Sequence, residues 1–158
     1  MAGLTIALVL HVLAVVVWIG GVAMVTTVIL PVARKLKRPE EQIAFFTSIE
    51  RRFVWFARGA VLIVGLSGFD MVQRLRLWSV LNSLRYWWLC AMVLVWLLFA
   101  LILFVAEPLL KTRIEKRMMA VPERSLARLR LVHWILLLLS ALAIAGGVAG
   151  SHGLSLFG

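Results

Sequence analysis

The sequence has one cysteine, Cys90, and only seven Asp or Glu among its 158 residues. A single thiol cannot close an intramolecular disulfide or form a CxxC pair, so a disulfide scaffold and a thiol redox motif are both excluded. Charged residues make up 15% of the chain and hydrophobic residues 63%, far from the usage of soluble domains. This composition excludes a water-soluble globule and indicates a small integral membrane protein.

Several catalytic and nucleotide-binding motifs are also missing. No Walker, GxGxxG, HExxH or Ser-His-Asp pattern occurs, so nucleotide hydrolysis and protease chemistry have no support. The net charge of +10 comes from 17 Lys and Arg. These residues lie between long apolar stretches, so we interpret them as membrane-topology signals and predict no nucleic-acid partner.

Four stretches of the chain are apolar enough to cross a bilayer, which takes about 20 residues each. They cover residues 4–30, 53–73, 86–106 and 131–150. The first lacks the basic start of a signal peptide and is longer than its apolar core, so we expect it in the mature protein. Pro39 and the two acidic residues after it predict a separate short helix before the second span. The fold class is therefore an all-α integral membrane four-helix bundle, with residues 1–158 as a single membrane domain surrounded by lipid.

The basic residues are unevenly distributed over the connections. Six follow the first span, three precede the third and seven precede the fourth, which gives 13 against 3. The positive-inside rule places the first and third connections in the cytoplasm. We expect a multi-pass protein of a bacterial-type inner membrane with both termini outside.

The two halves of the sequence resemble each other. Matching residues recur 77 to 79 positions apart, and each half ends in a glycine-rich helix. The pairs are Trp18 and Trp96, Pro31 and Pro108, and Trp55 and Trp134. This spacing favours two duplicated helical hairpins in parallel orientation, although chance matches in apolar sequence are the alternative.

An outer polar layer is predicted from the depth of polar residues within the spans. At about 1.5 Å per residue, His11, Cys90 and Met92 fall within about 3 Å of one another along the membrane normal. Asp70 and His152 lie further out. Because polar groups in hydrocarbon usually face the bundle interior, His11 is either a ligand or a structural histidine that donates to a carbonyl or a serine. Cys90 and Met92 are either soft metal ligands or apolar filler.

An inner polar layer contains Arg58, Glu107 and His133. We expect Arg58 to pair with Glu107 or with a neighbouring carbonyl, because an unpaired guanidinium near the membrane core costs about 3 kcal/mol or more. His133 either pairs with Glu107 or is solvated at the interface. It shares a helix face with Ser140, which we expect to point into the bundle.

The first span reads LHVLAVVVWIGG, followed by a proline and a basic stretch. It resembles the first helix of copper-resistance D (CopD)-like membrane proteins, and the likeness is carried by His11, Trp18, Gly20 and Gly21. The segment IERRFVWFARG is similar to the start of the second helix in HemJ-type protoporphyrinogen oxidases, which are small haem-associated membrane proteins. The resemblance implies a metal or haem context, with His11 as the residue carried over.

Three hypotheses remain open. The first is a redox or binding protein for b-type haem, held by His11 with either Met92 or His152. The second is copper handling without haem, in which His11, Cys90 and Met92 bind Cu(I). The third is a non-catalytic accessory subunit of a larger membrane complex. A homodimer or such a complex is the expected assembly, and the sequence leaves open whether the chain is an enzyme.

Overall fold

A computed structural model describes residues 2–80, 83 and 86–152. Helices make up nearly all of this part of the chain, and π-turns interrupt two of them. In order, the elements are α1 (Ala2–Met24), the π-turn η1 (Val25–Ile29), α2 (Leu30–Ala33), α3 (Pro39–Arg74), the short 3₁₀-helix η2 (Leu77–Val80), α4 (Trp87–Leu101), the π-turn η4 (Ile102–Ala106), α5 (Glu107–Ala120) and α6 (Pro122–Ser151).

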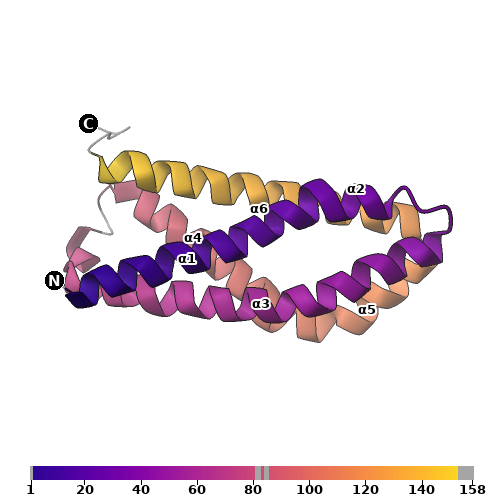
Figure 1. Ribbon diagram of the computed structural model, residues 1–158, viewed down its shortest axis with the longest axis horizontal. Coiled ribbons are helices and arrows are strands. Elements are labelled where there is room, and N and C mark those ends of the chain that lie inside the picture. Colours follow the sequence, from indigo (N-terminus) through magenta and orange to yellow (C-terminus); the bar gives the residue numbers. More distant parts are fainter. Residues whose placement is uncertain (1, 81–82, 84–85, 153–158) are drawn as a thin grey trace.

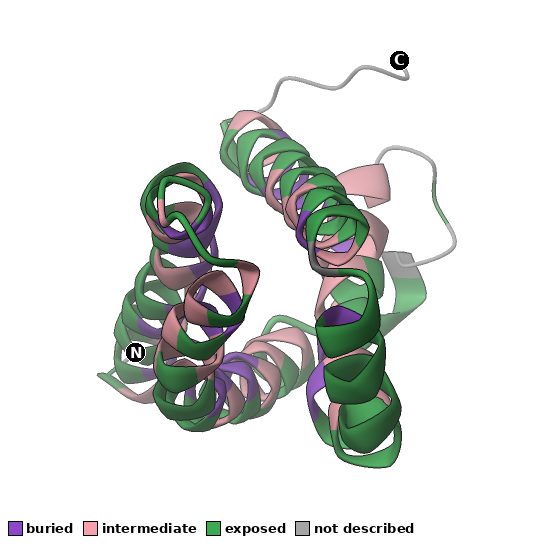
Figure 2. Ribbon diagram, turned by 90° about the vertical axis from the view of Figure 1, so that its right-hand side faces the viewer, coloured by how far each residue is buried: buried purple, intermediate pink, exposed green. Residues whose placement is uncertain are grey.

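The long helices run up and down along one common axis, and the start of α1 and the end of α6 lie at the same end of the molecule (Figure 1). Buried residues follow the faces where helices meet, and exposed residues cover the outside (Figure 2). Within the described residues, four helical segments are long and apolar enough to span a membrane. The predicted all-α four-helix membrane bundle is therefore confirmed.

The helices reach well beyond the apolar band. Helix α3 has 36 residues, or about 54 Å at 1.5 Å per residue, whereas the hydrocarbon core is about 30 Å thick. The predicted separate helix before the second span is wrong, because no proline or glycine interrupts residues 40–58 and the helix runs straight into the span. The extensions form what we call the basic lobe, residues 30–52 and 107–130. The core of the lobe is made of Leu30, Ile43, Phe46, Met118 and Leu126, together with Val25 of η1.

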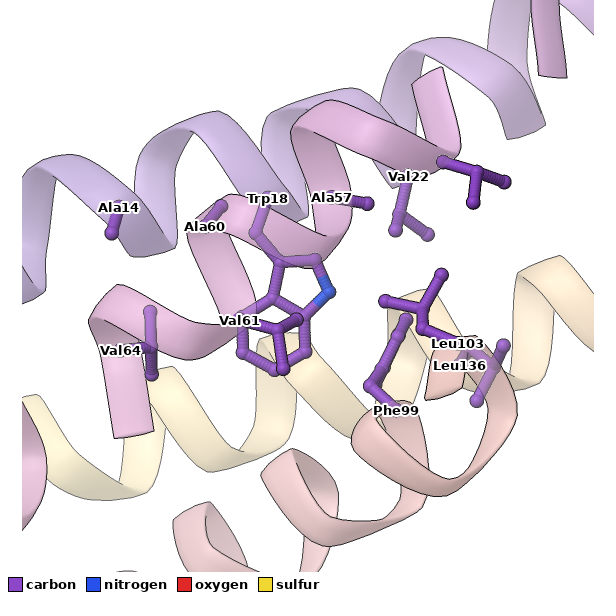
Figure 3. Close-up of a cluster of buried hydrophobic side chains, with 11 residues drawn as sticks. Ala14, Trp18, Val22, Ala57, Ala60, Val61, Val64, Phe99, Leu103 and Leu136 are labelled. Atoms are coloured by element: carbon purple, nitrogen blue, oxygen red, sulfur yellow. The ribbon is translucent and has the colours of Figure 1, made fainter. Parts of the chain in front are cut away.

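A second core fills the membrane-spanning part (Figure 3). Its centre is Trp18, only 4% exposed, whose ring meets Phe99 at a centroid distance of 4.7 Å and an interplanar angle of 88°. Within the described chain, the buried indole Nε1 has no conventional acceptor. Figure 3 shows this nitrogen on the side of the indole toward Phe99.

Glycines make room for aromatic side chains at several helix contacts. A Cβ added to Gly65 would lie 2.5 Å from Trp96 Cζ2, and one added to Gly150 would lie 2.2 Å from Trp88 Nε1. Trp87 and Trp88 thus pack against the glycine-rich face of α6. These glycines serve close helix packing, as expected for small residues in membrane bundles.

We expect Gly65→Ala to destabilise the bundle by about 1–3 kcal/mol, the usual cost of overpacking a tight contact. The Trp96 ring that would have to move is held by a hydrogen bond of 2.8 Å from its Nε1 to the Val61 carbonyl. Gly59→Ala is the matched control on the same helix, because a Cβ there would meet nothing within 4 Å. Thermal unfolding in detergent measures both. Equal melting temperatures for the two variants would contradict the packing role of Gly65.

Candidate functional site

His11 lies between α1 and α3. Its Nδ1 is 3.1 Å from the carbonyl oxygen of Val64 and 3.1 Å from Ser67 Oγ. A Cβ added to Gly68 would come within 3.2 Å of the imidazole Cε1, so the ring also lies close to the backbone of α3 there. All of these contacts of the half-buried histidine are with one neighbouring helix, α3.

These contacts define the tautomer of His11. The Val64 carbonyl can only accept a hydrogen bond, and Ser67 already donates its hydroxyl proton to the Ile63 carbonyl. Nδ1 therefore carries the proton, and the lone pair of the neutral ring lies on Nε2. The structural alternative foreseen for His11, donation to a carbonyl and a serine, is realised at Nδ1. Within the described residues, no hydrogen bond to Nε2 is found.

The other expected ligands contact different parts of the bundle. Met92 packs against α6, where its Cε would lie 1.9 Å from a Cβ added to Gly147, and Cys90 is half-buried on α4. His152 is exposed at the end of α6, and its Nδ1 is 2.8 Å from the Val148 carbonyl. No three His, Cys, Asp or Glu side chains gather into a metal-binding group in the described ranges. The grouping of His11 with Cys90, Met92 or His152 stays a prediction.

His133 is satisfied locally. Its Nδ1 is 2.9 Å from the Leu129 carbonyl on the preceding turn of α6, so it does not take the expected alternative partner Glu107. Ser140 is only 2% exposed, which confirms that this face of α6 points into the bundle. Among the three histidines, only His11 makes its Nδ1 contact across a helix interface.

The expected pairing of Arg58 is confirmed with both partners at once. Its Nη2 donates to Glu107 Oε2 at 2.8 Å, and Nε and Nη2 both donate to the Leu103 carbonyl at 3.0 and 2.9 Å. The two side chains are 19% and 23% exposed. Trp55 lies beside the guanidinium, 5.0 Å from ring centroid to Cζ. Arg58 therefore links α3 to the junction of α4 and α5.

The Leu103 carbonyl needs Arg58 because of a proline. In η4 the N–H of Glu107 donates to the Ile102 carbonyl, five residues back. The same pattern would pair the Leu103 carbonyl with residue 108, which is a proline and has no N–H. Arg58 supplies the missing donor. Sequence reasoning placed Arg58 correctly by depth but missed this role, whose only signal was Pro108.

The first half of the chain repeats this backbone pattern. In η1 the N–H of Leu30 donates to the Val25 carbonyl, and Pro31 then leaves the Thr26 carbonyl without its donor. Each half thus contains a π-turn one residue before a proline, and its next long helix begins with Pro39 or Pro122. The hypothesis of two duplicated hairpins gains backbone support from this match.

A small cavity of about 50 Å³ lies beside the Arg58–Glu107 pair, between α3 and α5. This space is enough for water molecules. Its wall is formed by Thr47, Glu50, Arg51, Val54, Glu107, Lys111, Ile114, Glu115 and Met118. Lys111 Nζ lies 3.7 Å from Glu107 Oε1. The polar side chains of this wall border Glu107 on the side toward the basic lobe.

Comparison of the chain with protein-family models, curated proteins and solved structures finds no match. The functional inference therefore depends on the geometry and on the sequence resemblance.

Proposed function

We propose that this integral membrane protein binds b-type haem or a transition-metal ion through Nε2 of His11, and has a redox or metal-homeostasis role of the CopD-like kind. The observation that carries the proposal is the anchoring of Nδ1. Histidines that bind metals almost always donate their other ring N–H to a carbonyl, carboxylate or water, which fixes the ring and increases its basicity. Val64 and Ser67 provide this arrangement for His11.

The residues around His11 orient one imidazole that can act as a ligand to iron or a metal ion. A bound haem iron or metal ion would supply electron-transfer or Lewis-acid chemistry, and the chain would supply the ligand, its tautomer and its orientation. Copper handling through His11, Cys90 and Met92 is less favoured, since His11 packs on α3 whereas Met92 packs on Gly147 of α6. Haem or a metal bound by His11 as its main protein ligand is the form that the contacts favour.

The proposal includes an orientation. His11 lies in the first half of α1. The start of α1 and the end of α6 lie at one end of the bundle, and the basic lobe forms the opposite end (Figure 1). The positive-inside rule favours the cytoplasm for the basic lobe. The His11 site would then lie in the half of a bacterial-type inner membrane that faces outward.

The experiment that tests this function is a titration of the purified wild-type protein in neutral-lipid nanodiscs, once with haem and once with Cu(I). We expect saturation at one equivalent per chain for one of the two. A Soret band that shifts on binding identifies haem, whereas metal analysis identifies copper. A protein that retains neither after gel filtration is not a haem or copper protein, and co-purification with a large membrane partner would then favour an accessory subunit.

A further inference from the structure

The two π-turns occupy matching positions in the two halves of the chain, but only one of them is braced by a side chain. In η4, Arg58 donates twice to the Leu103 carbonyl that Pro108 leaves without a donor. In η1, the corresponding carbonyl belongs to Thr26, a residue that is 1% exposed. No side chain of the described residues donates to the Thr26 carbonyl. The carbonyl that the proline leaves without a backbone donor is therefore satisfied by a side chain in one half only.

The side chains of the two turns increase this difference. The hydroxyls of Thr26 and Thr27 donate to the carbonyls of Val22 and Ala23, four residues back, at 2.7 and 2.8 Å. Such hydrogen bonds from threonine to the preceding turn weaken and bend helices. The five residues of η4 are Ile, Leu, Phe, Val and Ala, none of which can form them.

η1 lies where two buried clusters meet, and Phe53 of α3 packs against both of them. A bend at η1 therefore has a structural consequence. Val22, just before the turn, belongs to the core of the spans, whereas Val25 and Leu30 belong to the core of the basic lobe. A change of angle at η1 would move the span portion of α1 relative to the lobe. This portion carries His11, so its hydrogen bonds to α3 would respond to the angle.

We propose that η1 is a flexible hinge, whereas η4 is held rigid by Arg58. Helix α1 bends against α2 at η1, whereas the bidentate contact of Arg58 and its ion pair with Glu107 hold α4 and α5 as one rod. The hinge is a property of the backbone and does not depend on what His11 binds.

The test is hydrogen–deuterium exchange by mass spectrometry on the full chain in neutral-lipid nanodiscs. It compares the peptides that cover residues 25–33 and 102–110. In the wild type we expect the first segment to exchange about tenfold faster or more, since a hydrogen bond from a charged group is typically worth enough for such a ratio. The two segments occupy matching positions in their halves, so we expect lipid to shield their amides from exchange to a similar extent. Equal exchange rates in the wild type would overturn the proposal.

Two variants separate the hinge from general loosening. Arg58→Met should raise the exchange of 102–110 toward that of 25–33 and leave the latter unchanged. Pro31→Ala restores an N–H for the first turn and should slow exchange in 25–33 severalfold. If Arg58→Met does not fold, the wild-type ratio and Pro31→Ala still decide the question. An equal increase in both segments in Arg58→Met, or no change in Pro31→Ala, contradicts the proposal.

Discussion

Arg58→Met is expected to destabilise the folded protein by about 3 kcal/mol, the lower end of the usual cost of removing one partner from a buried ion pair, because both side chains are only partly buried. The substitution leaves two groups unsatisfied, the Leu103 carbonyl and the Glu107 carboxylate. Lys111, 3.7 Å from the carboxylate, compensates only in part. Reversible unfolding in mixed micelles measures the loss.

Two further variants make this result specific. Arg52→Met removes an exposed arginine from the same helix and should change the stability by less than about 0.5 kcal/mol, as is usual for surface positions. Arg58→Met combined with Glu107→Gln should recover part of the loss, because the uncompensated charge is gone. If Arg58→Met costs no more than Arg52→Met, the guanidinium reaches the headgroups in solution and the pair has no structural role.

His11→Ala is expected to remove bound haem or metal almost completely, because no other side chain of the described residues presents an anchored imidazole across a helix interface. His133→Ala is the matched control, since that histidine bonds only to its own helix. Ser67→Ala should weaken binding about tenfold or less, since Val64 still accepts from Nδ1 and loss of an outer partner typically costs 10–100-fold. Cofactor content after gel filtration measures all three. Full retention in His11→Ala would make His11 a structural histidine.

The sequence was sufficient for the four spans and for the Arg58 pair. Both depend on distance along the helix axis, which follows directly from residue counting. Arg58 and Glu107 lie at similar depths in neighbouring spans, and each is too costly to leave alone in hydrocarbon. Pairing was therefore the arrangement that the sequence favoured, with a guanidinium extended to the headgroups as the alternative.

Rotation about the helix axes could not be predicted in the same way. His11, Cys90 and Met92 were grouped by equal depth, yet the contacts of His11 lead to α3 and those of Met92 lead to α6. In an almost uniformly apolar span, few polar residues are present to show which face of the helix points into the bundle. The packing of glycines against tryptophans sets the rotation, and it appears only when the helices are assembled.

The shift of hydrogen bonds at the π-turns was also beyond sequence reasoning. In the sequence, Pro31 and Pro108 stand out only as a repeated pair, 77 positions apart. They did not indicate that the helix would widen by one residue and continue, or that Arg58 would fill the gap in the second half only. That outcome depends on a donor from another helix.

The state of the two His11 nitrogens is the most direct test of the proposed site. It can be read by nitrogen NMR on protein with ¹⁵N-labelled histidine, in which His133 and His152 are replaced by glutamine. Without ligand we expect Nδ1 to be protonated and Nε2 to carry the lone pair. On titration with the haem or metal that binds, the Nε2 resonance should shift or broaden while Nδ1 keeps its proton. An Nε2 resonance that is protonated from the start, or one that is unchanged at saturation, would contradict the assignment of His11 as the ligand.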